Sequence, residues 1–525
     1  MDILKKYSFK IKSKLANKVR RTSKKGSSDS LQYRRNNSLP FFNTRAKIGP
    51  KIVVTPSEKT NEPSPITRSL SDATITLAQR RANKLKIICA NSGVCMAFGK
   101  ENKKIKEHFD EFTNFKYVTE KIKRIGKPSK NGFINQLTYN RRGYIAYTIL
   151  KSSANEMADN LLYEYLVGQY INKQCLLFSC FLETYGVFKY TSNDTWDTMK
   201  KIKIKDPSLL KECINIPPIN SREDFDIACT HSKYICIQIQ HMAEAINLCD
   251  LLDNIEFCNN ELLYILYQIY LPLYCLNQNF THYDLHSNNI MIYEPIKGQT
   301  IDYCYILNDE TKIEFKSRYI AKIIDYGKSF FKDEESHNEL TKSSSSILKV
   351  ICQRKACQIE YETSEPDVYE TECGTDYGFY WLQDVRDTKH EQIYINSSKS
   401  NISHDLRLLY DIFGIMTQKK RKLHLAKYGT EPFPELLTSM YSHINLIQLL
   451  SKVVFNNNYG TIENSKHGLP NKINNVIDAY HAIEEELKLP QNITQNENYY
   501  RGIPSIGRIT IYENGRKMKY DAFNL

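Results

Sequence analysis

The stretch His282–Ile292 constrains the fold of this chain most, because it places charged and amide side chains directly before a strand-like run. Within it, Asp284 precedes Asn289 by five residues. A second apolar run, Tyr319–Ile324, follows later in the chain and ends in Asp325. Carboxylate and amide oxygens are ligands that Mg²⁺ prefers. The pattern therefore predicts one polar site built at the ends of two strands that are far apart in sequence.

This spacing suits transfer of a phosphoryl group from a nucleotide. Such a reaction needs one carboxylate to orient the attacking hydroxyl, and an amide and a second carboxylate to hold Mg²⁺ on the phosphates. We predict that Asp284 orients the hydroxyl and accepts its proton late, and that Asn289 and Asp325 hold Mg²⁺. We expect His286 to donate to the transferred phosphate. We expect His282 to brace the loop through hydrogen bonds.

A lysine and a glutamate upstream are candidates for the nucleotide-binding part of the same site. Gly143–Lys151 is a β-branched and aromatic run that ends in Lys151, and it predicts a strand. Glu164 follows within Asp159–Gly168, whose apolar residues have helical spacing. A strand lysine that reaches the α- and β-phosphates needs an anion to hold it, and a helix glutamate can be that anion. Each could also be an ordinary surface residue, but their order before Asp284 favours the functional interpretation.

A glycine-containing turn precedes that strand. Lys116–Ile125 is predicted to be a strand, and the polar segment Gly126–Phe133 separates it from the next strand-like run. Backbone N–H groups in such a loop can bind phosphates, and Gly126 and Gly132 allow a close approach. A plain hairpin turn would give the same pattern, because the segment lacks the full G-x-G-x-x-G motif.

Further patterns predict strands first and mainly helices afterwards. Tyr234–Gln240 reads as a strand and Ala243–Leu252 as a short helix, which together resemble a hinge with backbone groups available to an adenine edge. Glu261–Phe280 predicts a long buried helix; its polar residues and Pro272 argue against a membrane span. The remaining expectations are a strand pair at Cys180–Phe188, helices at Glu101–Phe115, Leu436–Phe455 and Ile473–Leu487, a helix beginning in Ser403–Phe413, a hairpin from Arg508 to Tyr520, loops or short helices at Thr191–Ser232, and irregular structure at Lys328–Ser403.

The positive charge of the chain is concentrated at its N-terminus. The net charge is +13, and Met1–Pro50 alone holds fourteen Lys and Arg residues against two Asp. Residues 1–84 lack hydrophobic periodicity and are rich in Lys, Arg, Ser, Asn and Thr, so we expect a disordered basic tail. Such a tail could contact an anionic surface, whether lipid, nucleic acid or acidic protein.

The cysteines and the first residues indicate where the chain resides. Its 14 Cys are scattered without a C-x-x-C pair, which suits a reducing compartment and gives no zinc pattern. The start, Met1–Lys6, has no apolar segment typical of a secretory signal, so we expect a chain that is not secreted and has no transmembrane segment.

These motifs, in this order, resemble the protein-kinase superfamily from about residue 116 to residue 487. The resemblance implies that Lys151 is the phosphate-pairing strand lysine and Glu164 its helix partner. It further implies that Asp325 is the Asp of the D-F-G motif, here D-Y-G, and that Asp405 is the buried Asp that braces the catalytic loop. ATP and Mg²⁺ are the implied cofactors, and protein hydroxyls the implied acceptors.

The fold implied is α+β and bilobal, with a small antiparallel β-rich N-lobe and a larger helical C-lobe behind the disordered tail. The expected domains are the tail at 1–84, an N-lobe with a family-specific N-terminal extension at 85–240, a helical C-lobe with the catalytic loop at 241–490 and a C-terminal hairpin or extension at 491–525. More narrowly, the chain resembles serine/threonine kinases of giant DNA viruses such as mimiviruses, which implies the host cytoplasm or the virion. That resemblance is carried by Ser92–Lys100, Leu150–Ser153, Asp159–Gly168, His282–Ile290 and Asp405–Leu409.

The chain departs from the serine/threonine kinase pattern at His286, where those enzymes place a lysine that neutralises the transferring phosphate. Histidine there is shared with aminoglycoside-phosphotransferase-like enzymes, which also show H-x-D-x-H-x-x-N, so a small-molecule acceptor is an alternative expectation. A clear Ala-Pro-Glu motif does not follow Asp325. A kinase-like scaffold without catalysis is a third alternative, and nucleic-acid binding by the tail could coexist with any of them.

Overall fold

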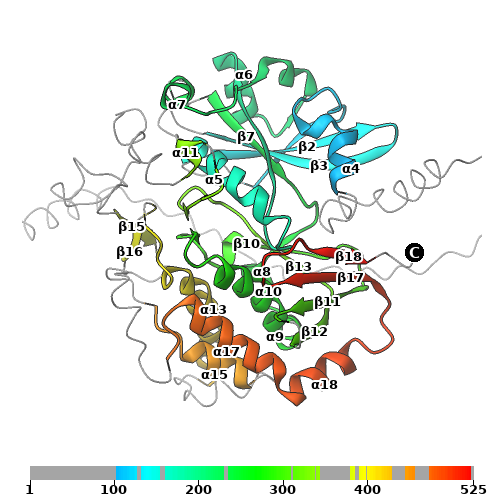
Figure 1. Ribbon diagram of the computed structural model, residues 1–525, viewed down its shortest axis with the longest axis vertical. Coiled ribbons are helices and arrows are strands. Elements are labelled where there is room, and N and C mark those ends of the chain that lie inside the picture. Colours follow the sequence, from blue (N-terminus) through cyan, green and yellow to red (C-terminus); the bar gives the residue numbers. More distant parts are fainter. Residues whose placement is uncertain are drawn as a thin grey trace, which may run out of the picture. The chain divides into compact units, whose positions relative to one another are not determined.

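The computed structural model describes the chain from residue 102 to residue 521 with several gaps, and all of these residues belong to the compact unit Ala73–Leu525 (Figure 1). The basic tail and the segment Ser92–Lys100 lie outside the described residues. The described ranges are 102–126, 132–153, 160–229, 234–308, 311–336, 338–342, 379–384, 390–395, 397, 399–428, 444–455 and 472–521.

This part of the chain mixes helices with sheets that are mostly antiparallel, the largest of which is a curled antiparallel sheet of seven strands. Its order is β5-β1-β2-β3-β7-β4-β6. Arg142 and Gly143 form the two-residue turn between β2 and β3, and both have positive φ (54° and 81°), as a type I′ turn requires. The strands are β1 Ile122–Ile125, β2 Gly132–Arg141, β3 Tyr144–Ser153, β4 Thr184–Tyr190, β5 Ile204–Lys205, β6 Cys213–Asn215 and β7 Ile235–Gln240.

Both faces of this sheet are covered. Every residue of β7 is buried, because successive side chains enter different clusters: Cys236 packs with Leu137 and Trp196 on one face, and Ile237 packs with helix residues on the other. The helix on the second face is α5, Asn160–Gln174. It approaches β4 closely at Gly168, where an added Cβ would collide with the side chain of Thr184.

The segment expected to be loops or short helices at 191–232 does contain helices α6 (Asn193–Lys201) and α7 (Arg222–Cys229). It also supplies β5 and β6, which extend the sheet at its two edges. These strands span two and three residues and are too short to show an alternating pattern. The strand expected at Lys116–Ile125 is shorter than predicted, since only its last four residues pair as β1. The helix expected at Glu101–Phe115 is α4 (Asn102–His108) followed by a 3-10 turn.

The buried helix predicted at Glu261–Phe280 is α10, Leu262–Cys275. It ends five residues early, and the chain turns before pairing as β9 (Phe280–Thr281) with β14 (Phe330–Phe331). No helix among the described residues is long and apolar enough to cross a membrane. The other helices are α8 Leu248–Leu251, α9 Ile255–Asn260, α11 Glu339–Lys342, α13 Arg407–Tyr428, α15 Ile444–Ser451, α17 Val476–Lys488 and α18 Pro490–Tyr499.

A small sheet brings the segment that contains Asp284 and Asn289 next to the segment that contains Asp325. Strands β10 (Ile290–Tyr293) and β13 (Ile320–Ile323) pair antiparallel, with Ile290 opposite Ile323, and β8 (Ile246–Asn247) completes the sheet. Just beyond the paired ends, the backbone N–H of Ile324 donates to the carbonyl of Asn289 (3.0 Å). The register therefore places Asn289 beside the residue that precedes Asp325.

The predicted C-terminal hairpin is present as β17 (Ser505–Tyr512) and β18 (Lys519–Asp521). Its first strand, β17, also pairs in parallel with β11 (Thr300–Ile306), which is itself paired with β12 (Lys312–Ser317) (Figure 1). The region 328–403 was expected to be irregular but includes the hairpin β15–β16 (Phe379–Asp384 and His390–Ile395). Of Leu436–Phe455, the part before residue 444 lies outside the described residues.

Candidate active site

The amine of Lys151 joins two carboxylates that are remote from each other in sequence. Lys151 lies on β3, and its Nζ is 2.8 and 2.6 Å from the two carboxylate oxygens of Glu164 on α5. The same Nζ is 2.9 Å from Oδ1 of Asp325, which follows β13. The predicted strand lysine, helix glutamate and second aspartate therefore converge on one point.

Burial and charge act against each other in this cluster. Burial disfavours the Lys151 ammonium, but Asp325 and Glu164 outweigh it and raise the pKa of Lys151 above its ordinary value. Burial also raises the pKa of Glu164 to about 7, although Lys151 opposes that rise. The pKa of Asp325 is lowered, chiefly by Lys151. At neutral pH the cluster thus holds a charged lysine and an ionised Asp325.

Two cations hold the carboxylate of Asp284. Its Oδ1 accepts from Nη1 of Arg407 (2.7 Å), and its Oδ2 accepts from Nζ of Lys328 (3.0 Å). Nε2 of His286 lies 3.8 Å from Oδ1. Burial alone would raise the pKa of Asp284, but Lys328 and Arg407 hold it well below its usual range. Asp284 is therefore a carboxylate at any physiological pH.

The backbone around Asp284 is held in a strained conformation by a buried aspartate. Tyr283 has a φ of +62°, a left-handed conformation that is unfavourable for an aromatic residue. Asp405 accepts from the backbone N–H groups of His282 (2.8 Å) and Tyr283 (3.0 Å). Burial raises the pKa of Asp405 to about 7, and these two N–H groups act in the opposite direction.

His282 links the loop to the strand that carries Asp325. Its Nδ1 accepts from the backbone N–H of Asp284 (3.2 Å), so its Nε2 carries the proton and donates to the carbonyl of Ile324 (3.0 Å). The ring is fully buried, and burial lowers the pKa of His282 to about 4. It is thus a neutral bracing group.

The predicted metal ligands fit Mg²⁺ by their chemistry. Nδ2 of Asn289 donates to the carbonyl of Asp284 (2.8 Å), so Oδ1 is the atom of this amide that could coordinate a cation. The carboxylate of Asp325, whose backbone has a φ of +68°, is the other oxygen group that could coordinate the ion. Within the described ranges, no group of three or more His, Cys, Asp or Glu residues could hold a metal. Mg²⁺ is commonly held by one or two protein carboxylates together with phosphate oxygens, so a nucleotide would supply the remaining ligands.

The glycine turn is described only at its two ends. Gly126 has a φ of +63° and follows β1, while residues 127–131 lie outside the described residues. At Gly132 an added Cβ would lie 2.8 Å from the carbonyl oxygen of Ser152. The close packing of β2 against β3 therefore favours glycine at position 132 whether or not this residue contacts phosphate.

Sequence reasoning missed four residues that complete the loop. Lys328 and Arg407 hold Asp284, Asp411 accepts from the N–H (2.8 Å) and hydroxyl (2.5 Å) of Ser287, and Asn247 donates to the carbonyl of Asn288 (2.6 Å). For three of them the sequence offered only their position near a predicted residue. Lys328 follows Asp325 by three residues, and Arg407 and Asp411 follow Asp405 by two and six residues. No spacing rule connects such positions to Asp284.

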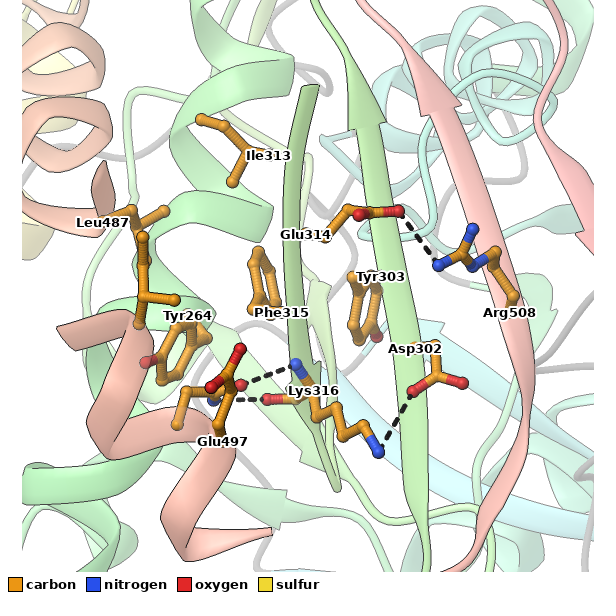
Figure 2. Close-up of a pocket in the computed structure, with 12 residues that line it drawn as sticks. Tyr264, Asp302, Tyr303, Ile313, Glu314, Phe315, Lys316, Leu487, Glu497 and Arg508 are labelled. Carbon is orange, nitrogen blue, oxygen red and sulfur yellow. Dashed lines mark hydrogen bonds and ion pairs between the residues drawn. The ribbon is translucent and has the colours of Figure 1, made fainter. Parts of the chain in front are cut away.

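A separate pocket of about 180 Å³ lies between the β11–β12 hairpin and helices α17 and α18 (Figure 2). Tyr264, Tyr303 and Phe315 form its aromatic wall. Two ion pairs lie among its lining residues: Arg508 is 2.9 Å from Glu314, and Lys316 is 3.9 Å from Asp302. None of the predicted site residues lines it.

No protein-family model matches this chain, and no curated protein matches it either. Function is therefore inferred from the geometry of the described residues.

Proposed function

We propose that this chain is an ATP- and Mg²⁺-dependent phosphotransferase that transfers the γ-phosphate of ATP to serine or threonine hydroxyls of proteins. The observation that carries the proposal is the contact of the Lys151 amine with both Glu164 and Asp325. A lysine held by a helix glutamate beside a metal-binding aspartate is the arrangement with which protein kinases bind the nucleotide phosphates.

The order of elements supports the same proposal. In protein kinases the phosphate-binding lysine lies on the third strand and its glutamate partner on the next helix; here they lie on β3 and on α5. On this proposal the seven-stranded sheet with α5 is the small lobe of a bilobal kinase fold. The part containing α10, α13 and α17 is its large helical lobe, and the connection from β7 to α8 is the hinge.

Each residue has a role in this mechanism. Lys151 would bind the α- and β-phosphates, and Asn289 and Asp325 would hold Mg²⁺, which neutralises charge on the β- and γ-phosphates when bound. Asp284 would orient the acceptor hydroxyl. Because the pKa of Asp284 is held well below its usual range, it is a weak base and accepts the proton only late in the transfer. Positioning and charge neutralisation supply most of the rate.

The proposal is tested by incubating the purified full chain with Mg²⁺ and γ-labelled ATP in the presence of a protein mixture. We expect labelled serine and threonine. Asp284→Asn should keep Mg²⁺-nucleotide binding and lose turnover by about 10²-fold or more, whereas Asp325→Ala should lose both. Full activity in either variant would overturn the assignment.

A small-molecule acceptor is the second candidate, because His286 occupies the position where serine/threonine kinases have a lysine. In that case label should move to an aminoglycoside or sugar panel and not to protein. The two candidates share the nucleotide site and differ only in the acceptor, so the same preparation and variants distinguish them.

A further inference from the structure

The catalytic loop itself brings no cation to the place where the phosphoryl group would be transferred. Residues 282–289 contain neither Lys nor Arg. Nδ1 of His286 accepts from the backbone N–H of Asn288 (3.3 Å) and caps the short 3-10 turn Ser287–Asn289, so this nitrogen carries no proton and the ring is neutral. A protein cation at the transferring phosphoryl group, in addition to Mg²⁺, would therefore come from another segment.

Lys328 is such a group. Its Nζ lies 3.0 Å from Oδ2 of Asp284, in a side chain that is 17% exposed. Its backbone is anchored on both sides. Ser329 donates through its hydroxyl to the carbonyl of His282 (3.2 Å), and Ser397 donates to the carbonyl of Lys328 (2.5 Å). The fold therefore fixes the backbone of Lys328 beside the loop, so its amine is not brought there by a freely moving surface side chain.

The two cations at Asp284 differ in what they can do. Arg407 is only 6% exposed and opens α13 two residues after Asp405, so it is fixed in the interior and positions the carboxylate. Lys328 is more accessible and carries a compact ammonium on a flexible stem, which can adjust to a passing phosphate. Lys328 also follows Asp325 by three residues in the sequence. It thus belongs to the segment that carries Asp325, and its amine contacts Asp284.

We propose that Lys328 contacts the transferring γ-phosphoryl group and neutralises its charge, while Arg407 holds Asp284. This inference rests on the proposed phosphotransfer function. The phosphoryl group moves from the nucleotide, held at Asp325 and Asn289, to a hydroxyl held at Asp284, so it passes the ammonium of Lys328. The bond from the γ-phosphorus to the bridging oxygen breaks, and its electron pair leaves with ADP. A bond to the acceptor oxygen forms, and the hydroxyl proton passes to Asp284.

The direct test measures the affinity of a fluorescent ADP derivative with Mg²⁺, with and without aluminium fluoride, which mimics the phosphoryl group in transfer. In Lys328→Met we expect the affinity for Mg²⁺·ADP to stay within about twofold, because the lysine contacts only the transferring group. The increase in ADP affinity that aluminium fluoride produces should fall by about 10²-fold, as expected for the loss of one charge-stabilising donor. Lys328→Arg should recover part of this gain.

The matched control is Lys332→Met, four residues on, whose side chain is 50% exposed and pairs with Glu334 outside the loop. It should behave as wild type. If Lys328→Met does not fold, Lys328→Gln gives the same comparison with the charge removed and a hydrogen-bond donor kept. Two results would overturn this inference while leaving the proposed function intact. One is a folded variant in which aluminium fluoride increases the affinity for Mg²⁺·ADP as much as in wild type. The other is a variant that loses Mg²⁺·ADP affinity equally in the presence and absence of aluminium fluoride. Wild-type protein that binds no Mg²⁺·ADP would overturn the proposed function as well.

Discussion

At the scale of single residues, this site depends on backbone conformations that side chains must stabilise. Tyr283 and Asp325 both have left-handed φ angles, which cost roughly 1–3 kcal/mol each for residues of this kind. The carboxylate of Asp405 holds the first, through two backbone N–H groups, and Lys151 contacts the second. Strain of this kind is common at functional sites because the productive geometry differs from the relaxed one.

Replacing Asp405 by Asn should therefore damage the loop without changing its volume. One of the two backbone N–H groups would face an amide nitrogen and lose its acceptor, at a cost of about 1–3 kcal/mol. Urea unfolding should show that loss, and nucleotide-dependent turnover should fall with it. Asp302→Asn is the control, since Asp302 is partly exposed and 3.9 Å from Lys316. Wild-type stability in Asp405→Asn would contradict the bracing role.

His282 makes the stability of the protein depend on pH. The folded state keeps its pKa at about 4, whereas an unfolded histidine titrates near its ordinary value of 6.5. Between these values the unfolded state binds more protons, so stability falls as pH falls from 6.5 to 4, by on the order of 3 kcal/mol. The loss is absent above pH 6.5.

We expect the change in unfolding free energy between pH 7 and pH 4.5 to be smaller in His282→Gln than in wild type. His481→Gln, which removes a half-exposed histidine, is the comparison variant for loss of a histidine outside the loop. Identical pH dependence in His282→Gln and wild type would show that the histidine is not held neutral.

At the scale of elements, hydrophobic periodicity predicted secondary structure best where the pattern lies within a single helix, strand or hairpin. The helix around Tyr267, the strand that carries Lys151 and the hairpin around Gly515 all follow from local sequence. The parallel pairing of β17 with β11 does not, because it joins residues some two hundred positions apart. The two cations that contact Asp284 were not predicted for the same reason, because the spacing of residues within one segment does not indicate which distant charged residue the fold places next to it.

The pair formed by β3 and α5 through Lys151 and Glu164 allows a prediction about stability. Both groups are largely buried, so Lys151→Met leaves a carboxylate in the interior without its nearest partner and should cost about 3 kcal/mol or more. Adding Glu164→Gln removes that carboxylate, so the double variant should be more stable than Lys151→Met although equally inactive. Urea unfolding of the four proteins measures this coupling. Simple additivity of the two losses would mean that the ion pair contributes nothing.

At the scale of the whole molecule, the candidate site is assembled from segments that belong to different sheets. Lys151 comes from the seven-stranded sheet, Asp325 from the end of the small sheet, and Asp284 from the loop that Asp405 braces. A nucleotide held by the first two would link both sheets. Binding to the folded state alone raises stability by about 2.7 kcal/mol at a hundredfold excess over Kd.

Mg²⁺·ATP should therefore raise the melting temperature of the full chain by a few degrees in one cooperative step, and EDTA should remove the increase. Asp325→Ala should lose the Mg²⁺-dependent part, because it removes the proposed metal ligand and a partner of Lys151 together. Asp284→Asn should keep it, since the proposed role of Asp284 is to orient the acceptor. An unchanged shift in Asp325→Ala would place the nucleotide elsewhere, whereas a shift lost equally in both variants would mean that Asp284 also contributes to nucleotide binding.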